Sequence, residues 1–273
     1  MENLPWQLRL VRKSIKKKEK IKLLDKILAV DEARTALDLG CAQGILSYFL
    51  HRKGGFWVHT DEDLANLRTA REILAGSLVQ MKGVSMSFRD QSFNLAVCLD
   101  YLEHVEDDQE CLREIARALK PGGELVLITP RTGKFFWLYK LRSLLGLKME
   151  FYGHKREGYT LQDLDEKIRR VGLEPFWRKT YSRFFSEFLE LILNFGYIKI
   201  LSAKPSEALR DGHIRPATAS EFQEQKKPFQ LYSTVYPFVW LASRLDRVFF
   251  FLKGYNVMVR ARKPSDIGIA STI

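Results

Sequence analysis

The sequence predicts an α/β protein with a doubly wound sheet and an apolar helical insertion before the last strand. A strand runs into a turn of small residues and then into a helix at residues 36–47. Short apolar strands then alternate with helical stretches as far as residue 180. An aromatic-rich block separates two further strand-like segments, 173–180 and 255–263. Because 46% of the 273 residues are hydrophobic, the chain can bury a substantial core, and we expect one elaborated domain.

The turn at residues 40–44 allows a ligand to approach the backbone closely. Gly40, Ala42 and Gly44 carry no bulky side chains, and the helix that follows offers N–H groups to a carboxylate or phosphate. Asp38 precedes the first glycine by two residues, where its charge would repel a pyrophosphate and attract an amino group. The spacing also differs from the G-x-G-x-x-G of dinucleotide sites. It favours a ligand with an ammonium, a carboxylate and a ribose, and S-adenosylmethionine has all three.

A second acid ends the next predicted strand, residues 56–61. Asp61 lies about 20 residues beyond the glycine turn, where a carboxylate can hold both ribose hydroxyls. Asp61 could instead cap a helix predicted at 62–74, because Asp is a favoured N-cap. From its position we predict the ribose role, with Glu62 beside it.

Two more strands follow with a helix between them. Residues 92–100 form a buried-looking strand that ends in Asp100. The helix predicted at 108–119 stops at Lys120-Pro121-Gly122-Gly123, and residues 124–130 form the next strand. A second helix, after residue 160, is predicted to be capped by Thr160. This alternation is typical of a parallel sheet.

Together these segments resemble a class I S-adenosylmethionine-dependent methyltransferase, of the broad group that includes the quinone-biosynthesis methyltransferases. The resemblance covers roughly residues 20–180. It rests on the turn that begins at Asp38, on Asp61, on Asp90-Gln91-Ser92-Phe93-Asn94, on Leu102-Glu103-His104-Val105 and on Leu119-Lys120-Pro121-Gly122-Gly123.

The resemblance implies a seven-stranded, Rossmann-like methyltransferase sheet and S-adenosyl-L-methionine as cofactor. Two positions depart from the group: Asn94 replaces an Asp, and Lys82-Gly83 stands where an acid usually contacts the adenine. The predicted cofactor-binding residues are Asp38, Gly40, Cys41, Ala42, Gly44, Asp61, Glu62 and Asp100.

In this fold the loops after the fourth and fifth strands open over the methyl donor, so their polar side chains are candidates for an acceptor site. We predict that His104 or His154 removes a proton from the acceptor as the methyl group moves. Tyr101, Arg156 and Tyr159 are the predicted substrate-binding residues, with Arg156 suited to a phosphate or carboxylate. Each of these side chains could instead stabilise a loop by hydrogen bonding. The cysteines lack metal-ligand spacing, and no metal site is predicted.

The charge of the chain indicates an anionic partner. The net charge is +11 and the pI about 9.5, which implies attraction to nucleic acid or to phospholipid headgroups. Residues 1–30 are predicted as a basic N-terminal helix, which either covers the sheet edge or lies on an anionic surface. No apolar core and cleavage site follow the cationic run, so no signal peptide is predicted and a cytoplasmic location is expected.

The insertion, residues 184–253, contains two apolar blocks. Charged residues interrupt both, so we predict that neither spans a membrane. The blocks either pack on each other as a closed lid or dock peripherally on the inner face of the cytoplasmic membrane. Tyr, Trp, Arg and Lys around them favour membrane docking. The first block has a helical stripe of Phe184, Phe188, Leu191, Phe195 and Ile198, and the second runs from Tyr232 to Leu252 and includes Trp240.

The sequence therefore predicts four segments: the basic helix 1–30, a methyltransferase core 31–183, the insertion 184–253, and a last strand and tail 254–273. The expected function is methyl transfer to a small or lipid-like acceptor, with oxygen favoured, at an anionic membrane surface in lipid, quinone or saccharide biosynthesis. Nucleic acid is an unlikely partner, because Asp100-Tyr101-Leu102-Glu103 stands where an N-P-P-aromatic tetrapeptide would mark an amino-methylating enzyme. A non-catalytic membrane-binding module is disfavoured because Asp38, the small-residue turn and Asp61 are all present.

Overall fold

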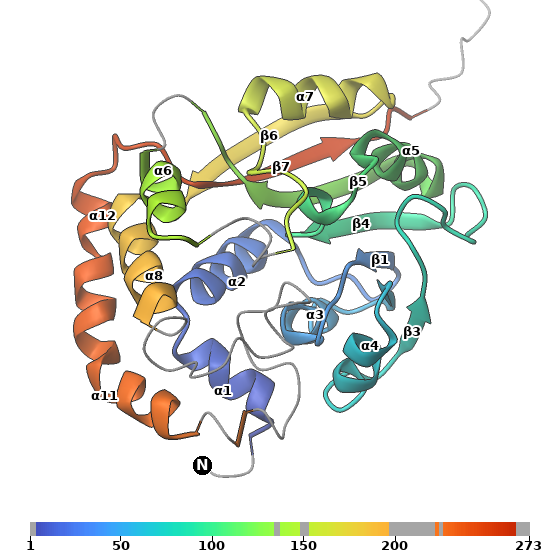
Figure 1. The fold of residues 1–273 in the computed structure, drawn as a ribbon. Coiled ribbons are helices and arrows are strands. Elements are labelled where there is room, and N and C mark those ends of the chain that lie inside the picture. Colours follow the sequence, from blue (N-terminus) through green and yellow to red (C-terminus); the bar gives the residue numbers. More distant parts are fainter. Residues whose placement is uncertain (1–3, 134–136, 148–152, 197–221, 224–225, 266–273) are drawn as a thin grey trace, which may run out of the picture.

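A seven-stranded sheet forms the centre of the molecule (Figure 1). The computed structural model describes residues 4–133, 137–147, 153–196, 222–223 and 226–265. The strand order is β3-β2-β1-β4-β5-β7-β6, and β7 runs antiparallel to both of its neighbours. This confirms the doubly wound sheet and the insertion between its last two strands. The strands are β1 (Thr35–Leu39), β2 (Phe56–Asp61), β3 (Ser77–Gln80), β4 (Phe93–Leu99), β5 (Leu119–Pro130), β6 (Glu174–Tyr181) and β7 (Asn256–Arg262).

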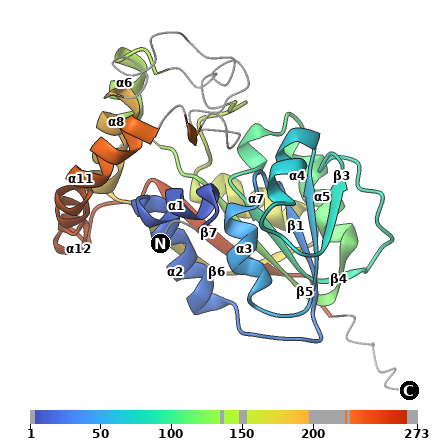
Figure 2. The same ribbon diagram turned by 90° about the horizontal axis from the view of Figure 1, so that it is seen from below.

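Helices cover both faces of the sheet (Figures 1 and 2). Apolar side chains of α5 (Asp108–Ala118) and α7 (Leu161–Arg170) pack on one face. Those of α2 (Ile15–Ile27) and α3 (Ile45–His51) pack on the other. The result is a three-layered domain. The other helices include α1 (Trp6–Arg12), α4 (Leu64–Ala70), the 3₁₀ turn η1 (Leu102–His104), α6 (Trp137–Leu144), α8 (Phe184–Gly196), α11 (Lys226–Ser243) and α12 (Leu245–Val248).

The basic N-terminal segment forms two helices where one was expected. Ser14 breaks it, because its hydroxyl accepts a hydrogen bond from the Lys17 N–H at 3.3 Å and so caps α2. The next two turns of α2 bury Leu23 and Leu24 against the sheet. The helix therefore covers the sheet while it carries most of the predicted cations.

Two local features differ from the sequence prediction. The short edge strand β3 was not located, because four residues are too few for a clear alternation. The helix expected at 62–74 is only α4, and its N-cap is Asp63, whose carboxylate accepts from the Ala65 N–H at 2.7 Å. Asp61 is therefore not the helix cap. The predicted cap of α7 is confirmed, with Thr160 accepting from the Asp163 N–H at 3.1 Å.

The first apolar block of the insertion is partly buried, with Leu191 2% and Ile192 50% exposed. Phe184, Phe188 and Leu191 of α8 lie against α6 and Tyr255. Phe184 and Phe188 are partly buried against this cluster, as the closed-lid alternative expects for this part of the stripe. Ile198 lies outside the described residues, as do 151–152 of the acceptor loop and 266–273 of the tail.

The second block lies on the outside of the molecule, where α11 and α12 form one margin (Figure 2). Asp246 of α12 accepts from the backbone N–H groups of Arg183, Phe185 and Ser186 at 2.8–3.1 Å, which caps α8 and holds α12 against it. Among the described residues, none of the helices has the length and apolarity that crossing a bilayer requires. The apolar side chains left exposed, which we call the α11–α12 face, are Leu231, Val235, Phe238, Trp240, Leu241, Leu245, Val248, Phe250 and Phe251.

Candidate functional site

Three strands end at one edge of the sheet and bring the predicted acids together. β1 pairs with β2 on one side and β4 on the other, so the glycine turn, Asp61 and Asp100 follow adjacent strand ends. A cavity of about 160 Å³ lies here. This is below the ~300–1,000 Å³ of most small-molecule sites, and its charged lining suits the amino-acid end of the predicted ligand. The cavity is lined by Lys17, Asp38, Gly40, Cys41, Ala42, Gln43, Ile45, Leu46, Ser47, Leu99 and Asp100.

The turn is shaped by two glycines and a tyrosine. Gly40 and Gly44 both have φ of +77°, a conformation that favours glycine. A Cβ atom on Gly40 would lie 2.4 Å from the Tyr101 ring, because that ring packs directly over the turn. The Tyr101 hydroxyl accepts from the Gly83 N–H at 3.1 Å, and only 9% of the residue is exposed. Tyr101, predicted to face the acceptor, thus supports the turn.

Asp61 is bonded to the turn as well as to its own loop. One carboxylate oxygen accepts from the Ala42 N–H at 2.8 Å, and the other accepts from the Asp63 N–H and the Asn66 amide. No sequence signal indicated the bond to Ala42, which joins different strand ends. Glu62 is exposed beside this carboxylate. The ribose role of Asp61 stays a prediction, and the structure adds a role in fixing the turn.

Asp38 is buried, and two hydrogen bonds fix its carboxylate. Oδ2 accepts from the Ser47 hydroxyl at 2.5 Å and contacts His59 Nδ1 at 2.9 Å. Burial raises the pKa of the neighbouring Cys41 thiol, and the charges of Asp38 and Asp61 add to that effect. The thiol is therefore neutral.

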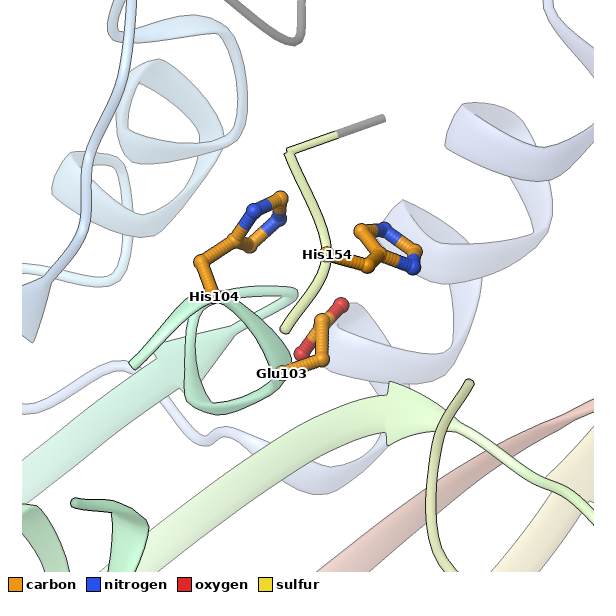
Figure 3. Close-up of side chains that lie close together, drawn as sticks. All are labelled: Glu103, His104 and His154. Atoms are coloured by element: carbon orange, nitrogen blue, oxygen red, sulfur yellow. The ribbon is translucent and has the colours of Figure 1, made fainter. Parts of the chain in front are cut away.

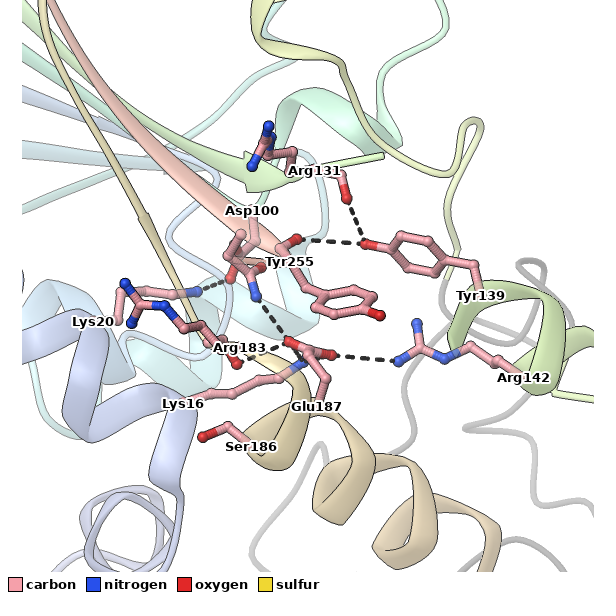
Figure 4. Close-up of polar contacts among 12 residues, drawn as sticks. Lys16, Lys20, Asp100, Arg131, Tyr139, Arg142, Arg183, Ser186, Glu187 and Tyr255 are labelled. Atoms are coloured by element: carbon pink, nitrogen blue, oxygen red, sulfur yellow. Dashed lines mark hydrogen bonds and ion pairs between the residues drawn. The ribbon is translucent and has the colours of Figure 1, made fainter. Parts of the chain in front are cut away.

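Helix α2 brings cations to the other side of the cavity. Lys20 forms an ion pair with Asp100 (Figure 4), and Lys17 belongs to the cavity lining. Burial raises the pKa of Asp100, but the Lys20 ammonium outweighs it and the net pKa is lowered. Behind this pair, the buried carboxylate of Glu187 contacts Lys16 at 2.8 Å and Arg142 at 3.8 Å. The sequence did not indicate these links between α2, α6 and α8.

Glu103, His104 and His154 form a compact cluster (Figure 3). The two imidazoles meet edge to face with centroids 4.8 Å apart, and one ligand atom from each of the three residues lies within 4.8 Å of the others. Such a set can exchange protons and also matches the ligand types of a divalent cation site. Spacing could not reveal it, because His154 joins from a distant loop.

The two histidines have different surroundings. The Nδ1 atom of His104 lies 3.0 Å from the Gly153 carbonyl oxygen, which can only accept, so Nδ1 carries the proton and Nε2 is the basic atom. Burial, with the nearby His104, lowers the pKa of His154 to about 3. His154 is therefore neutral and weakly basic at neutral pH. The geometry favours His104 as the base.

Arg156 and Tyr159, the other predicted substrate contacts, converge on Asp108. The Arg156 guanidinium pairs with Asp108 and also donates to the Val105 and Glu106 carbonyls at 2.7 and 2.8 Å. Tyr159 is 1% exposed and donates to Asp108 at 2.8 Å. These bonds join the loop of His154 to the loop of His104. Both side chains therefore position the cluster, and neither belongs to the cavity lining.

The carboxyl of Glu103 makes stability depend on pH. Burial, with the charge of Asp100, raises its pKa from 4.5 to about 8. Between these values the unfolded chain loses the proton while the folded chain keeps it, so this residue lowers the stability of the folded protein as pH rises. We expect Glu103→Gln to gain stability relative to the parent from pH 5 to pH 8, measured by urea denaturation. Glu106→Gln, at a side chain 90% exposed, is the control, and parallel pH curves for Glu103→Gln and parent would contradict the buried acid.

Comparison with known proteins identifies relatives of this chain among methyltransferases. Residues 37–127 match the family model of a methyltransferase domain. A ubiquinone biosynthesis O-methyltransferase from Klebsiella pneumoniae is 30% identical over 111 residues, which cover 38% of this chain and 46% of that protein. The chain therefore spans about half the length of the curated relatives it matches.

Solved structures share the fold over most of the chain. The cyclase SpnF has a TM-score of 0.59 and 17% identity, covering 91% of this chain and 81% of that one. A geranyl diphosphate C-methyltransferase from Streptomyces coelicolor A3(2), in complex with Mg²⁺, geranyl diphosphate and S-adenosyl-L-homocysteine, has a TM-score of 0.53 and 14% identity, covering 90% and 77%. Because one of them is a cyclase, the fold alone does not establish methyl transfer.

Proposed function

We propose that this chain, which carries a class I S-adenosylmethionine-dependent methyltransferase domain, transfers a methyl group to an oxygen atom of a small or lipid-like acceptor. The proposal rests on the convergence of the glycine turn, Asp38 and Asp100 on one cavity at the strand ends. The positive φ angles at Gly40 and Gly44 belong to a turn without bulky side chains, which the donor can approach closely, and the Asp38 carboxylate suits its ammonium. The name of the O-methyltransferase relatives supports oxygen as the methylated atom.

The proposed mechanism is in-line displacement at the sulfonium methyl. The acceptor oxygen must lie about 3 Å from the methyl carbon, so positioning supplies much of the rate. Nε2 of His104 takes the acceptor proton, and the bond from Nδ1 to the Gly153 carbonyl keeps the ring in that tautomer. The sulfonium leaves as a neutral thioether and needs no acid.

Calorimetry with S-adenosylhomocysteine, followed by transfer of labelled methyl from S-adenosylmethionine to lipid, saccharide and nucleic-acid fractions, tests this function. We expect binding, and label in an organic-soluble fraction. Label in RNA or DNA would point to a nucleic-acid methyltransferase, and binding without transfer to a non-catalytic module. A chelator arm shows whether transfer needs a divalent cation at the Glu103, His104 and His154 cluster.

We further propose that the enzyme works at an anionic membrane surface, which the α11–α12 face contacts. Phe238, Phe250 and Phe251 are 69–74% exposed there, a large cost in water unless a partner covers them. Arg244 stacks on Trp240 at 4.1 Å, and Arg247 and other cations accompany the same segment. Exposed aromatics with adjacent cations are typical of interfacial helices. A lipid-like acceptor would then enter from the bilayer.

Changing Phe238, Phe250 and Phe251 to Ser should abolish flotation with vesicles that contain anionic phospholipid. Each aromatic side chain that is fully withdrawn from water contributes roughly 1.5–3 kcal/mol to the free energy of membrane binding. Three such changes therefore remove most of the affinity of a peripheral protein for the vesicle. The matched control changes Val30, Phe56 and Phe176 to Ser. These side chains are also exposed, but they lie outside the α11–α12 face. The melting temperature should stay near that of the parent in both variants. A parent protein that does not float at all would end the membrane proposal.

A further inference from the structure

A buried histidine on β2, His59, lies beside the acid of the glycine turn and takes no part in the mechanism above. Its side chain is 0% exposed, and its ring stacks on Trp57 at 5.9 Å with the planes 5° apart. In the parallel pairing of β1 and β2, His59 stands directly opposite Asp38. The two side chains therefore share one face of the sheet and meet at 2.9 Å, Nδ1 to Oδ2.

The surroundings of this imidazole determine its tautomer. A carboxylate accepts hydrogen bonds, so the proton of His59 sits on Nδ1 and is donated to Asp38. The Nε2 atom is buried, and no described residue hydrogen-bonds to it. His59 thus bonds to Asp38 through Nδ1, and no described residue bonds to its other ring nitrogen.

The orientation of Asp38 follows from these bonds. His59 and the Ser47 hydroxyl, from β2 and α3, both bond to Oδ2, so the carboxylate is fixed from two directions. A carboxylate held through one oxygen can still offer the lone pairs of the other to a cation. Asp38 also lines the cavity. The cation that its free oxygen would meet there is the ammonium on the amino-acid end of the donor.

We propose that His59 is a positioning residue for donor binding, which aims the Asp38 carboxylate at the ammonium of S-adenosylmethionine. This inference rests on the proposed donor binding at the cavity. Its role is distinct from that of an ordinary core histidine, because removing its bond should affect only ligands that carry the amino-acid end.

Two ligands separate these roles. S-adenosylhomocysteine has the ammonium and carboxylate, and 5′-methylthioadenosine has the same nucleoside without them. We expect His59→Leu to weaken S-adenosylhomocysteine binding about tenfold and to leave 5′-methylthioadenosine binding unchanged, measured by calorimetry. His59→Asn should restore most of the loss, because its amide N–H can occupy the position of Nδ1–H. His51→Asn is the matched control, since His51 lies 6.1 Å from the His59 ring and does not bond to Asp38.

The outcomes are distinguishable. Equal weakening of both ligands, or parent-like binding of S-adenosylhomocysteine by His59→Leu, would show that His59 only packs in the core and would overturn the inference. If His59→Leu fails to fold, His59→Gln replaces it, because its amide reaches the Nε2 position and cannot restore the bond to Asp38. A parent chain that binds neither ligand would instead refute the proposed function.

Discussion

Replacing Gly40 with alanine is expected to weaken S-adenosylhomocysteine binding about 100-fold, or roughly 2.7 kcal/mol. The added Cβ would meet the Tyr101 ring at 2.4 Å, and φ of +77° disfavours any side chain there. Strain at such a backbone position costs about 1–3 kcal/mol, and displacing the tyrosine adds an overpacking cost of similar size. The chain can relieve the backbone strain and the collision with the tyrosine by distorting the turn. A distorted turn would no longer hold the donor.

Gly172→Ala is the matched control for this change. Gly172 has φ of +78°, almost the value of Gly40, and nothing lies within 4 Å of its virtual Cβ. It therefore carries the same backbone strain without the collision. Calorimetry should show parent-like affinity for Gly172→Ala, and a comparable affinity for Gly40→Ala would mean that the donor does not bind at this turn.

His104→Ala should lower kcat by about 10²–10⁴, the usual contribution of a general base, with little change in donor affinity. His104→Asn should be nearly as slow, because its amide can still donate to the Gly153 carbonyl but offers no basic nitrogen. His154→Ala should have a smaller effect, since the low pKa of that imidazole makes it a poor base. The rates are measured with labelled donor at saturating acceptor.

This pair of variants separates basicity from loop support. If His104→Asn retained the parent rate, the histidine would serve only to hold Gly153. Loss of activity in His104→Ala together with loss of donor binding would indicate a collapsed loop, which 5′-methylthioadenosine binding and the melting curve would reveal.

The sequence predicted the parts of the fold that have strong local signals. The turn after β1, the cap at Thr160 and the insertion before β7 follow from residue types at fixed spacing, and the structure has all three. β3 was missed because a four-residue edge strand carries little pattern. The two apolar blocks looked alike in sequence, and the contacts that α6 makes with one side of α8, while Phe238 and Leu241 of α11 stay exposed, could not be predicted from it.

The site was predictable at the strand ends and much less so in its supporting contacts. Parallel strands must bring Asp38, Asp61 and Asp100 to one edge, so their proximity follows from topology. Whether a loop tyrosine or arginine faces a ligand depends on partners that arrive from other segments. Arg156 and Tyr159 both bond to Asp108, and no spacing in the sequence indicates that these three residues meet.

Several cations of α2, and Lys13 just before it, are engaged by other side chains of the molecule. Lys16 and Lys20 are paired with Glu187 and Asp100, while Lys13 and Lys18 sit over the ring of Tyr236 at 5.0 and 4.9 Å. These two acids are already counted in the formal charge of +11, but the ion pairs leave fewer cations of this segment available to a bilayer than its lysine count suggests. Ionic strength should consequently matter less for attachment than the count of basic residues suggests, and most of the adhesion must come from the aromatic side chains of the α11–α12 face.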